Sequence, residues 1–360
     1  MHEPSFRNIS QSEAILQSLD QNLESDESVI LVGEGVPDPK GIFGTTAGLE
    51  EKYGSKRVFD MPLSENGMTG ICIGAALSGL KPVLVHQRVD FALLSLDQLI
   101  NNAAKWYFMF GSQFNVPIVI RMIIGRGWGQ GPQHSQSLQA LFAHIPGLKV
   151  VMPVFPHESA ALLTAAIQDK NPVIFLEHRW LHGLRGAVPR DIAPRPLDRA
   201  AVVREGQAIT VLATSYMVIE ALKAAELLSK KEVELEVINL ISISHLDIDT
   251  VMASVKKTGR VIVADSGHIN VGFSAEVSAR IVEQGFEYLL APPFRIGPPD
   301  HPASTSHYEM NDYYPTAKTI IEAAIELLPS IAEQFTGAEL AEALTNLHHD
   351  IPSPTYTGPF

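Results

Sequence analysis

The stretch Met61-Pro-Leu-Ser-Glu-Asn-Gly-Met-Thr-Gly-Ile-Cys-Ile-Gly-Ala-Ala-Leu-Ser-Gly79 is the one around which the rest of the chain is organised. It opens on a polar loop that carries Glu65 and continues as an apolar segment in which glycine recurs. A glycine inside a helix costs roughly 1 kcal/mol relative to alanine, and a close approach of another backbone or a flat ligand offsets that cost. We therefore predict a buried helix over residues 67–78, with Glu65 at its N-terminus.

Glu65 has two interpretations at this stage. Backbone N–H groups and the helix dipole favour a negative charge at a helix N-terminus, so Glu65 can simply cap the helix. The other interpretation is a carboxyl that is presented to a ligand. On spacing alone the cap is the more common explanation, and the rest of the chain has to decide.

Composition limits the classes of function. The chain has 360 residues, of which 46% are hydrophobic, and this length predicts two α/β domains with full cores. Lys and Arg total 27 against 40 Asp and Glu, which gives a net charge of −13. Because no basic run is available to follow a phosphate backbone, we expect no nucleic-acid partner.

The cysteine content and the apolar runs indicate the cellular compartment of the protein. Cys72 is the only cysteine, so the chain can form neither an internal disulfide framework nor a cysteine zinc site. The first residues have no apolar core of signal-peptide length, and no run of about 18 apolar residues occurs. We expect a cytoplasmic protein that does not enter a membrane.

Strand and helix patterns alternate through the first half of the chain. Alternation of this kind predicts a parallel, doubly wound sheet that presents its sites at the carboxyl ends of the strands. Ser12 is a plausible cap of the first helix. The expected helices are 12–23, 67–78, 95–109, 136–144 and 157–168, and the expected strands are 28–33, 81–86, 116–122, 148–152 and 172–176.

A second α/β pattern follows an interruption. Residues 177–206 lose the periodicity and carry several prolines, which indicates an interdomain linker. The predicted fold is thus α/β, with two doubly wound domains. We place these domains at 1–190 and 191–330, followed by an appended helix and tail at 331–360. The expected strands of the second domain are 208–213, 233–239 and 260–264, and its helices are 217–229, 248–257, 272–283 and 316–328.

Three segments besides the glycine-rich helix carry candidate chemistry. His86-Gln-Arg-Val-Asp-Phe91 ends a predicted strand, although ordinary loop polarity would explain it equally well. The glycine loop 126–136 leads His134 towards a helix, and histidine can move protons near neutral pH. Asp169 and Asn171 follow a helix C-terminus, where carbonyl and side-chain oxygens suit a hard cation. Taken alone, the last two segments are more often structural.

Several segments together resemble the β subunit of thiamine-diphosphate-dependent 2-oxo acid dehydrogenases, the decarboxylases of the pyruvate and branched-chain complexes. The resemblance covers roughly residues 10–328 and implies a pyrimidine-binding domain followed by a transketolase C-terminal-like domain. The segments that carry it are Gly41-Ile-Phe-Gly-Thr-Thr-Ala-Gly-Leu49, Arg57-Val-Phe-Asp-Met-Pro-Leu-Ser-Glu65, Asp97-Gln-Leu-Ile-Asn-Asn-Ala-Ala-Lys105, Val116-Pro-Ile-Val-Ile-Arg121, His134-Ser-Gln-Ser137 and Phe142-Ala-His-Ile-Pro-Gly-Leu-Lys-Val-Val-Met-Pro153.

The resemblance implies a shared cofactor site. In that family an α subunit holds Mg²⁺ and the diphosphate through a Gly-Asp-Gly motif, and this chain has no Asp-Gly pair. It therefore implies an α partner in an α2β2 heterotetramer, and a lipoyl acyltransferase core as the acceptor of the acyl unit.

The resemblance also assigns roles to individual residues. Glu65 matches the catalytic glutamate, whose carboxyl bonds to the pyrimidine N1′ and favours the tautomer that removes the proton from thiazolium carbon 2. Leu63, Gln87 and Phe91 match positions that line the pyrimidine, and His134 matches a histidine that faces the substrate and helps acyl transfer. A structural potassium site is implied at Ile118, Ala166, Ile167, Asp169 and Asn171.

Two other interpretations stay open. The chain can be the carboxyl half of a split transketolase that transfers an aldehyde unit, or a scaffold subunit that has kept the fold without catalysis. Ile123, Ile124, Arg126 and Trp128 stand where the family has glycine and small residues, and we expect them to narrow the entry of substrate. The sequence names neither the 2-oxo acid nor the acceptor.

Overall fold

The structure is a computed structural model, and it describes residues 5–125, 130–306, 308–310, 313–335 and 338. The described residues form two compact units, one of residues 5–125 with 141–197 and one of residues 130–140 with 198–335. The segment 130–140, which the sequence places inside the first domain, thus groups with the second unit.

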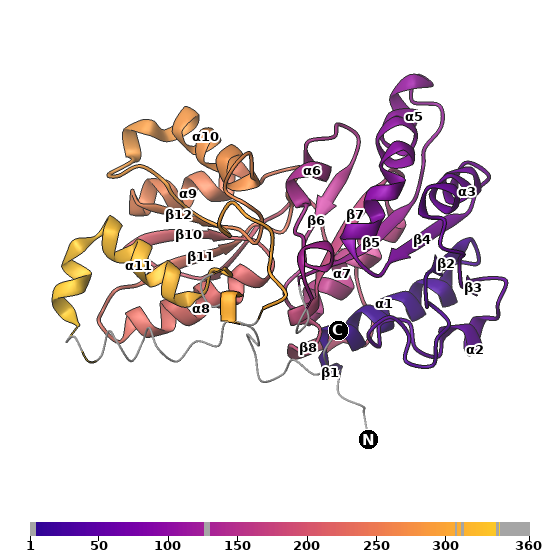
Figure 1. The fold of residues 1–360 in the computed structure, drawn as a ribbon, viewed down its shortest axis with the longest axis horizontal. Helices are drawn as coiled ribbons and strands as arrows, with labels where there is room; N and C mark the ends of the chain where they lie inside the picture. The colour runs from indigo at the N-terminus through magenta and orange to yellow at the C-terminus, as the bar shows by residue number, and fades with distance from the viewer. Residues whose placement is uncertain (1–4, 126–129, 307, 311–312, 336–337, 339–360) are drawn as a thin grey trace. The chain divides into compact units, whose positions relative to one another are not determined.

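The first unit is built on a six-stranded parallel sheet with strand order β3-β2-β4-β5-β7-β6. Its central strands are buried on both faces, which explains why they read as continuous apolar runs. The strands are β2 (Val29–Gly33), β3 (Val58–Phe59), β4 (Lys81–His86), β5 (Val119–Ile124), β6 (Lys149–Val151) and β7 (Val173–His178). Figure 1 shows helices on both sides of this sheet.

The helices of the first unit follow the predicted order with altered ends. Ser10 rather than Ser12 caps the first helix, in a capping box with Glu13. A hydrogen bond of 2.9 Å between the hydroxyls of Ser18 and Thr164 joins the first and last long helices. The helices are α1 (Gln11–Ser25), α2 (Leu49–Tyr53), α3 (Glu65–Leu77), α4 (Val89–Ala92), α5 (Ala104–Met109), α6 (Gln139–Ala143) and α7 (Pro156–Gln168).

The predicted continuous helix 95–109 was wrong. The chain forms a 3-10 turn (Leu93–Ser95) and a π-helical segment (Gln98–Ala103) before α5 begins. Within the π-helical segment the Asn102 amide donates to the Gln98 side chain at 3.0 Å. A sequence period of 3.6 residues does not reveal such a widened turn, because the apolar positions still fall on one face.

The predicted linker 177–206 contains two strands. β8 (Arg185–Pro189) pairs antiparallel with β1 (Phe6–Ser10), and β9 (Ala201–Arg204) forms the antiparallel edge of the second sheet. Both strands are short and only partly buried, so they lack the apolar run by which a central strand is recognised. Their partners are distant in sequence, which is why a local pattern could not find them.

The second unit has a five-stranded sheet with strand order β13-β12-β10-β11-β9. β10 lies between β11 and β12, so the chain continues first to one side of β10 and then to the other, as in a doubly wound fold. The sequence analysis missed β13, which has only three residues. The elements are β10 (Ile209–Ala213), β11 (Leu235–Asn239), β12 (Val261–Ala264), β13 (Phe294–Ile296), α8 (Tyr216–Ser229), α9 (Ile248–Thr258), α10 (Phe273–Gly285) and α11 (Ala317–Leu327).

The predicted appended segment 331–360 falls mostly outside the described residues. Its first residues belong to a 3-10 turn (Pro329–Gln334). Within the described part of the chain, no helix is long and apolar enough to cross a membrane.

Candidate active site

The candidate site lies at one edge of the six-stranded sheet, where three neighbouring strands end. β3, β2 and β4 are adjacent in that order, and Asp60, Glu34 and Gln87 directly follow them. Because the carboxyl ends of parallel strands meet at the same edge, the fold brings these three polar residues together.

Hydrogen bonds join the loops that follow these strands. The Gly35 N–H donates to Asp60 Oδ1 at 3.0 Å, and the Gln87 side-chain amide donates to the Glu34 carbonyl at 3.0 Å. Gly35 has a φ of +69°, and a Cβ atom there would lie 2.8 Å from Gln87 Nε2. Glycine is therefore required for the turn that presents Glu34.

Glu65 begins α3, as the sequence predicts, with an N-terminal charge that the helix dipole favours. The N-cap position belongs to Ser64, which makes no side-chain capping bond, so Glu65 is not itself the cap. Only 7% of Glu65 is exposed. A buried carboxyl without a capping role is consistent with the functional interpretation.

Glu34 is the site residue that sequence reasoning missed. Burial raises the pKa of its carboxyl, and the nearby charges of Glu65 and Asp60 raise it further. The position directly after a buried parallel strand, next to a flexible glycine, was the signal that could have identified Glu34.

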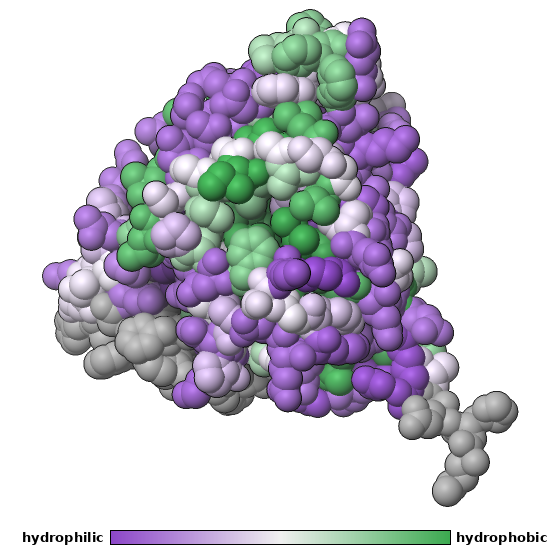
Figure 2. Space-filling view, turned by 90° about the vertical axis from the view of Figure 1, so that its right-hand side faces the viewer, coloured by the Kyte–Doolittle hydropathy of each residue, from purple (hydrophilic) through white to green (hydrophobic). Residues whose placement is uncertain are grey.

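The outer face of α3 contradicts the prediction of a buried helix. Ile71 is 63% exposed, and a Cβ atom added at Gly74 would meet no neighbour within 4 Å. Leu63 and Phe91, both expected to line a pyrimidine, are 83% and 37% exposed. Figure 2 shows hydrophobic surface gathered on this side of the unit. Small residues leave little side-chain volume on this face of the helix, and no other part of the described chain covers it.

His134 lies in a 3-10 turn (Pro132–His134), five residues before α6 begins. It is half-buried and belongs to the second unit. The helix expected at 136–144 is shorter and starts at Gln139. The facing of His134 towards a substrate thus stays a prediction.

The residues expected to bind potassium gather at the end of α7. The Asn171 N–H donates to Asp169 Oδ1 at 2.9 Å, and the Ile118 carbonyl accepts from the Val173 N–H at 3.0 Å. The Lys149 ammonium lies 2.5 Å from Asp169 Oδ2. The oxygens are therefore close together, but an ammonium already balances the Asp169 charge, and the potassium site stays a prediction.

The bulky residues expected at the entrance for substrate fall into two groups. Ile123 and Ile124 are fully buried in β5, where they form core and not a substrate loop. Strand sequence had been read as loop sequence because the strand extends two residues further than predicted. Arg126 and Trp128 lie outside the described residues.

A buried ion pair lies between β5 and β7. Arg121 Nε and Nη2 donate to the two carboxylate oxygens of Glu177 at 2.6 and 2.9 Å, and Nη2 also donates to Thr45 Oγ1 at 3.0 Å. Both charged side chains are fully buried. His182 Nε2 lies 3.4 Å from Glu177. Sequence reasoning assigned no role to Arg121 and Glu177.

Comparisons with known proteins cover both units. Residues 7–183 match the transketolase pyrimidine-binding domain family, and residues 198–320 match the transketolase C-terminal domain family. The chain is 42% identical over 316 residues to the pyruvate dehydrogenase E1 component subunit beta-1 of Oryza sativa, with 87% of this chain and 84% of that protein covered. It is 40% identical over 328 residues to the acetoin:2,6-dichlorophenolindophenol oxidoreductase subunit beta of Cupriavidus necator, with 88% and 97% covered.

The chain belongs to the E1 β-subunit family of the thiamine-diphosphate-dependent 2-oxo acid dehydrogenases.

A solved structure agrees on the fold. A split-gene transketolase, described as an inactive β4 tetramer, superposes with a TM-score of 0.73 over 90% of this E1 β-type chain and 99% of its own. Its sequence identity is only 20%, so it shows the fold alone. The dehydrogenase β subunits are about twice as similar in sequence, which favours the dehydrogenase over the split transketolase.

Proposed function

We propose that this chain is the β subunit of an enzyme that decarboxylates a 2-oxo acid and passes the acyl unit to a lipoyl group. The observation that carries this proposal is the buried carboxyl of Glu65, which begins α3 and whose charge raises the pKa of Glu34 beside it. A positioned carboxyl of this kind is what proton transfer on a bound cofactor needs.

The residues of this edge fit the pyrimidine half of thiamine diphosphate. The Glu65 carboxyl offers a hydrogen bond to a ring nitrogen, and Leu63 and Phe91 offer exposed apolar surface to the ring itself. Glu34 Oε1 is buried and has no hydrogen-bond partner among the described residues. Thiamine diphosphate, when bound, takes up the electron pair that decarboxylation releases.

In this proposal Glu34 supports the proton transfer by Glu65. The raised pKa of Glu34 lets this carboxyl hold a proton above the usual range of a carboxyl. Glu65 can then form its hydrogen bond with the pyrimidine nitrogen, because a protonated Glu34 places no second negative charge beside it. The links from Gln87 and Asp60 fix the loop that carries Glu34.

The proposal includes an α partner that holds Mg²⁺ and the diphosphate, in an α2β2 heterotetramer. Two features of the chain support it: the sequence has no Asp-Gly pair, and the outer face of α3 beside Glu65 is apolar and exposed. Exposed apolar surface of this kind is typical of an interaction site. The oxygens at the end of α7 are the place we propose for a structural potassium ion.

Turnover by the reconstituted enzyme tests the proposal. The chain is combined with an α-type partner, and the reduction of an artificial oxidant is followed with pyruvate and with branched-chain 2-oxo acids. Glu65→Gln should lower turnover by at least about 10²-fold, because an amide cannot share the proton. Glu50→Gln, in the first turn of α2, is the matched control and should leave turnover unchanged. Turnover within about threefold of wild type for Glu65→Gln would remove Glu65 from catalysis.

A further inference from the structure

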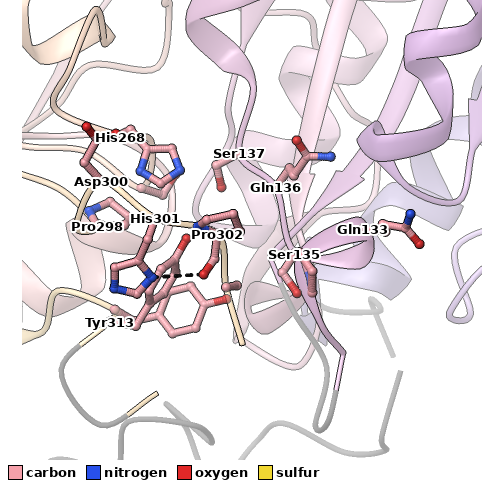
Figure 3. A pocket seen from close by; sticks show the side chains of 14 residues that line it. Gln133, Ser135, Gln136, Ser137, His268, Pro298, Asp300, His301, Pro302 and Tyr313 are labelled. Atoms are coloured by element: carbon pink, nitrogen blue, oxygen red, sulfur yellow. Dashed lines mark hydrogen bonds between the residues drawn. The ribbon is translucent and has the colours of Figure 1, made fainter. Parts of the chain in front are cut away.

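A cavity of about 500 Å³ lies in the second unit, at the carboxyl ends of β12 and β13 (Figure 3). We propose that it binds a small uncharged polyhydroxy compound, such as a monosaccharide or a polyol. None of its lining residues has a role in the proposed function, so the inference does not depend on that function. The lining consists of Pro132, Gln133, Ser135, Gln136, Ser137, Ser266, His268, Pro298, Asp300, His301, Pro302, Ala303, Tyr313 and Tyr314.

The position of the cavity agrees with a general rule of α/β folds. Ligands of open α/β sheets bind in the crevice outside the carboxyl ends of the strands. Ser266 and His268 follow β12, and Pro298 and Asp300 follow β13. The volume lies within the range of small-molecule sites, roughly 300 to 1,000 Å³.

A buried carboxylate holds one wall of the cavity to the sheet. Asp265, directly after β12, is fully buried and accepts from Thr214 Oγ1 at 2.6 Å and from Gln139 Nε2 at 2.8 Å. Gln139 Nε2 also lies 3.3 Å from the Ser266 hydroxyl. Because Gln139 lies two residues after the lining segment 132–137, these bonds hold that segment at the end of the sheet.

Close contacts at two glycines fix the other walls of the cavity. A Cβ atom at Gly131 would lie 2.4 Å from Thr305 Cγ2, and one at Gly297 would lie 2.5 Å from the Gly267 carbonyl oxygen. Only glycine permits contacts this close without movement of the neighbours. The loops around the cavity are therefore packed against each other, and the cavity is preformed.

The lining offers both acceptors and donors to a ligand. His268 Nδ1 donates to the Pro299 carbonyl at 3.0 Å, and His301 Nδ1 donates to the Pro302 carbonyl at 3.0 Å, as drawn for His301 in Figure 3. A carbonyl only accepts, so Nδ1 carries the hydrogen in each ring and Nε2 faces the ligand as the second ring nitrogen. The Asp300 carboxylate adds acceptors, and Gln133 and Ser137 add donors.

The same lining excludes other classes of ligand. None of the described lining residues is Lys or Arg, so no fixed positive charge is available to a phosphate or carboxylate. Tyr313 is only 5% exposed, and its ring is covered by His301 and Tyr314 with centroids 5.3 and 4.8 Å away. It thus presents no open face on which a nucleobase could stack. Hydroxyl groups, which both donate and accept, match the remaining groups.

Ligand titration followed by NMR tests the inference on the unmodified chain. D-glucose, D-xylose and glycerol are the probes, and the histidine ring resonances are the readout. We expect at least one probe to shift the resonances of His268 and His301 with saturation, and to leave exposed His245 unmoved. No saturable shift up to about 50 mM of every probe would overturn the proposal.

Two variants and two matched controls extend the test. Asp300→Asn and His301→Ala should each weaken binding of the probe about tenfold, because each removes a hydrogen-bonding group. Asp249→Asn and His245→Ala change exposed residues outside the lining and should bind as wild type does. Unchanged affinity in both lining variants would overturn the proposal, and so would tighter binding of inorganic phosphate, adenosine or methylammonium than of any sugar. The variants are first checked for an unchanged melting temperature, and the wild-type shifts remain decisive if a variant fails to fold.

Discussion

The two main sheets of this chain differ at the edge where their parallel strands end. At the carboxyl edge of the first sheet, buried Glu65 and half-buried Glu34 lie beside an apolar helix face that is open to solvent. At the carboxyl edge of the second sheet, tightly packed polar loops enclose a cavity. The two sheets differ in strand order, but in both the parallel strands present their carboxyl ends, and the following loops, at one edge. The first edge leaves apolar surface for a partner chain to cover, whereas loops of the second unit itself surround the cavity at the second edge.

The buried charges of the two units differ in the same sense. Burial raises the pKa of Glu177, but the charge of Arg121 and hydrogen bonds from His182 and Arg121 outweigh burial and bring the pKa to about 2. Asp265 has only neutral partners, so burial dominates and its pKa is raised. One unit therefore holds its buried carboxylate with a charge and the other with hydroxyl and amide groups.

Breaking the two carboxylates separately gives the largest expected effects. Glu177→Gln should destabilise the first unit by about 3 to 5 kcal/mol, because it leaves Arg121 buried without a counter-charge. Asp265→Asn should cost the second unit only about 1 kcal/mol, since an amide oxygen can still accept from Thr214 and Gln139. Hydrogen exchange read separately on peptides of each unit measures both. Equal losses of stability in the two units would contradict the difference between a charged and a neutral set of partners.

Acid should act on the two units in opposite directions. The folded pKa of Glu177 lies below its ordinary 4.5, so its contribution is present above pH 4.5 and is lost as the pH falls towards about 2. The folded pKa of Asp265 lies above its ordinary 3.8, so the folded state binds the proton first and gains stability as the pH falls towards 3.8. In Glu177→Gln and Asp265→Asn, the respective pH dependence should disappear.

His134→Ala tests the part that the second unit plays in the reaction, because His134 belongs to that unit. In the reconstituted enzyme, acylation of a lipoyl domain should fall by about 10²-fold, because a departing thiolate loses its proton donor. Release of CO2 with an artificial oxidant should stay within a few fold. Equal losses in the two assays would move His134 to substrate binding, and no loss in either would make it structural.

A charge on the exposed helix face should produce a smaller effect. Ile71→Asp should weaken association with the α-type partner by about tenfold, since it adds a charge to an apolar contact surface. Val271→Asp, at an exposed apolar residue of the second unit, is the control and should change the affinity by less than twofold, as a substitution outside the contact. Analytical ultracentrifugation of the mixed subunits measures both. A wild-type affinity for Ile71→Asp would show that this face is not covered by the partner.

The sequence predicted the fold class and the position of Glu65 at the start of a helix for physical reasons. Buried parallel strands read as apolar runs, and Glu65 stands at the start of a helix rich in glycine, so both signals are local. β8, β9 and β13 were missed because short, partly buried strands depend on partners far away in the chain. The burial of α3 was predicted wrongly because apolar composition does not say whether the same chain supplies the cover.

The site was predicted only in part for a similar reason. Glu34 gains its meaning from Glu65, which is 31 residues away in sequence, and no local pattern contains that pair. Ile123 and Ile124 were assigned to a substrate loop because β5 ends two residues later than its pattern suggested. The grouping of segment 130–140 with the second unit depends on close contacts such as that of Gly131 with Thr305, which only the structure shows.

Exchange of the proton on carbon 2 of bound thiamine diphosphate tests the central claim most directly. The claim is that the Glu65 carboxyl activates the cofactor at an edge that a partner completes. NMR of the quenched cofactor after mixing the reconstituted enzyme with D2O gives the exchange rate without any substrate. We predict that Glu65→Gln slows this exchange by at least about 10²-fold while Glu50→Gln leaves it unchanged. An exchange rate equal to wild type in Glu65→Gln would contradict the claim.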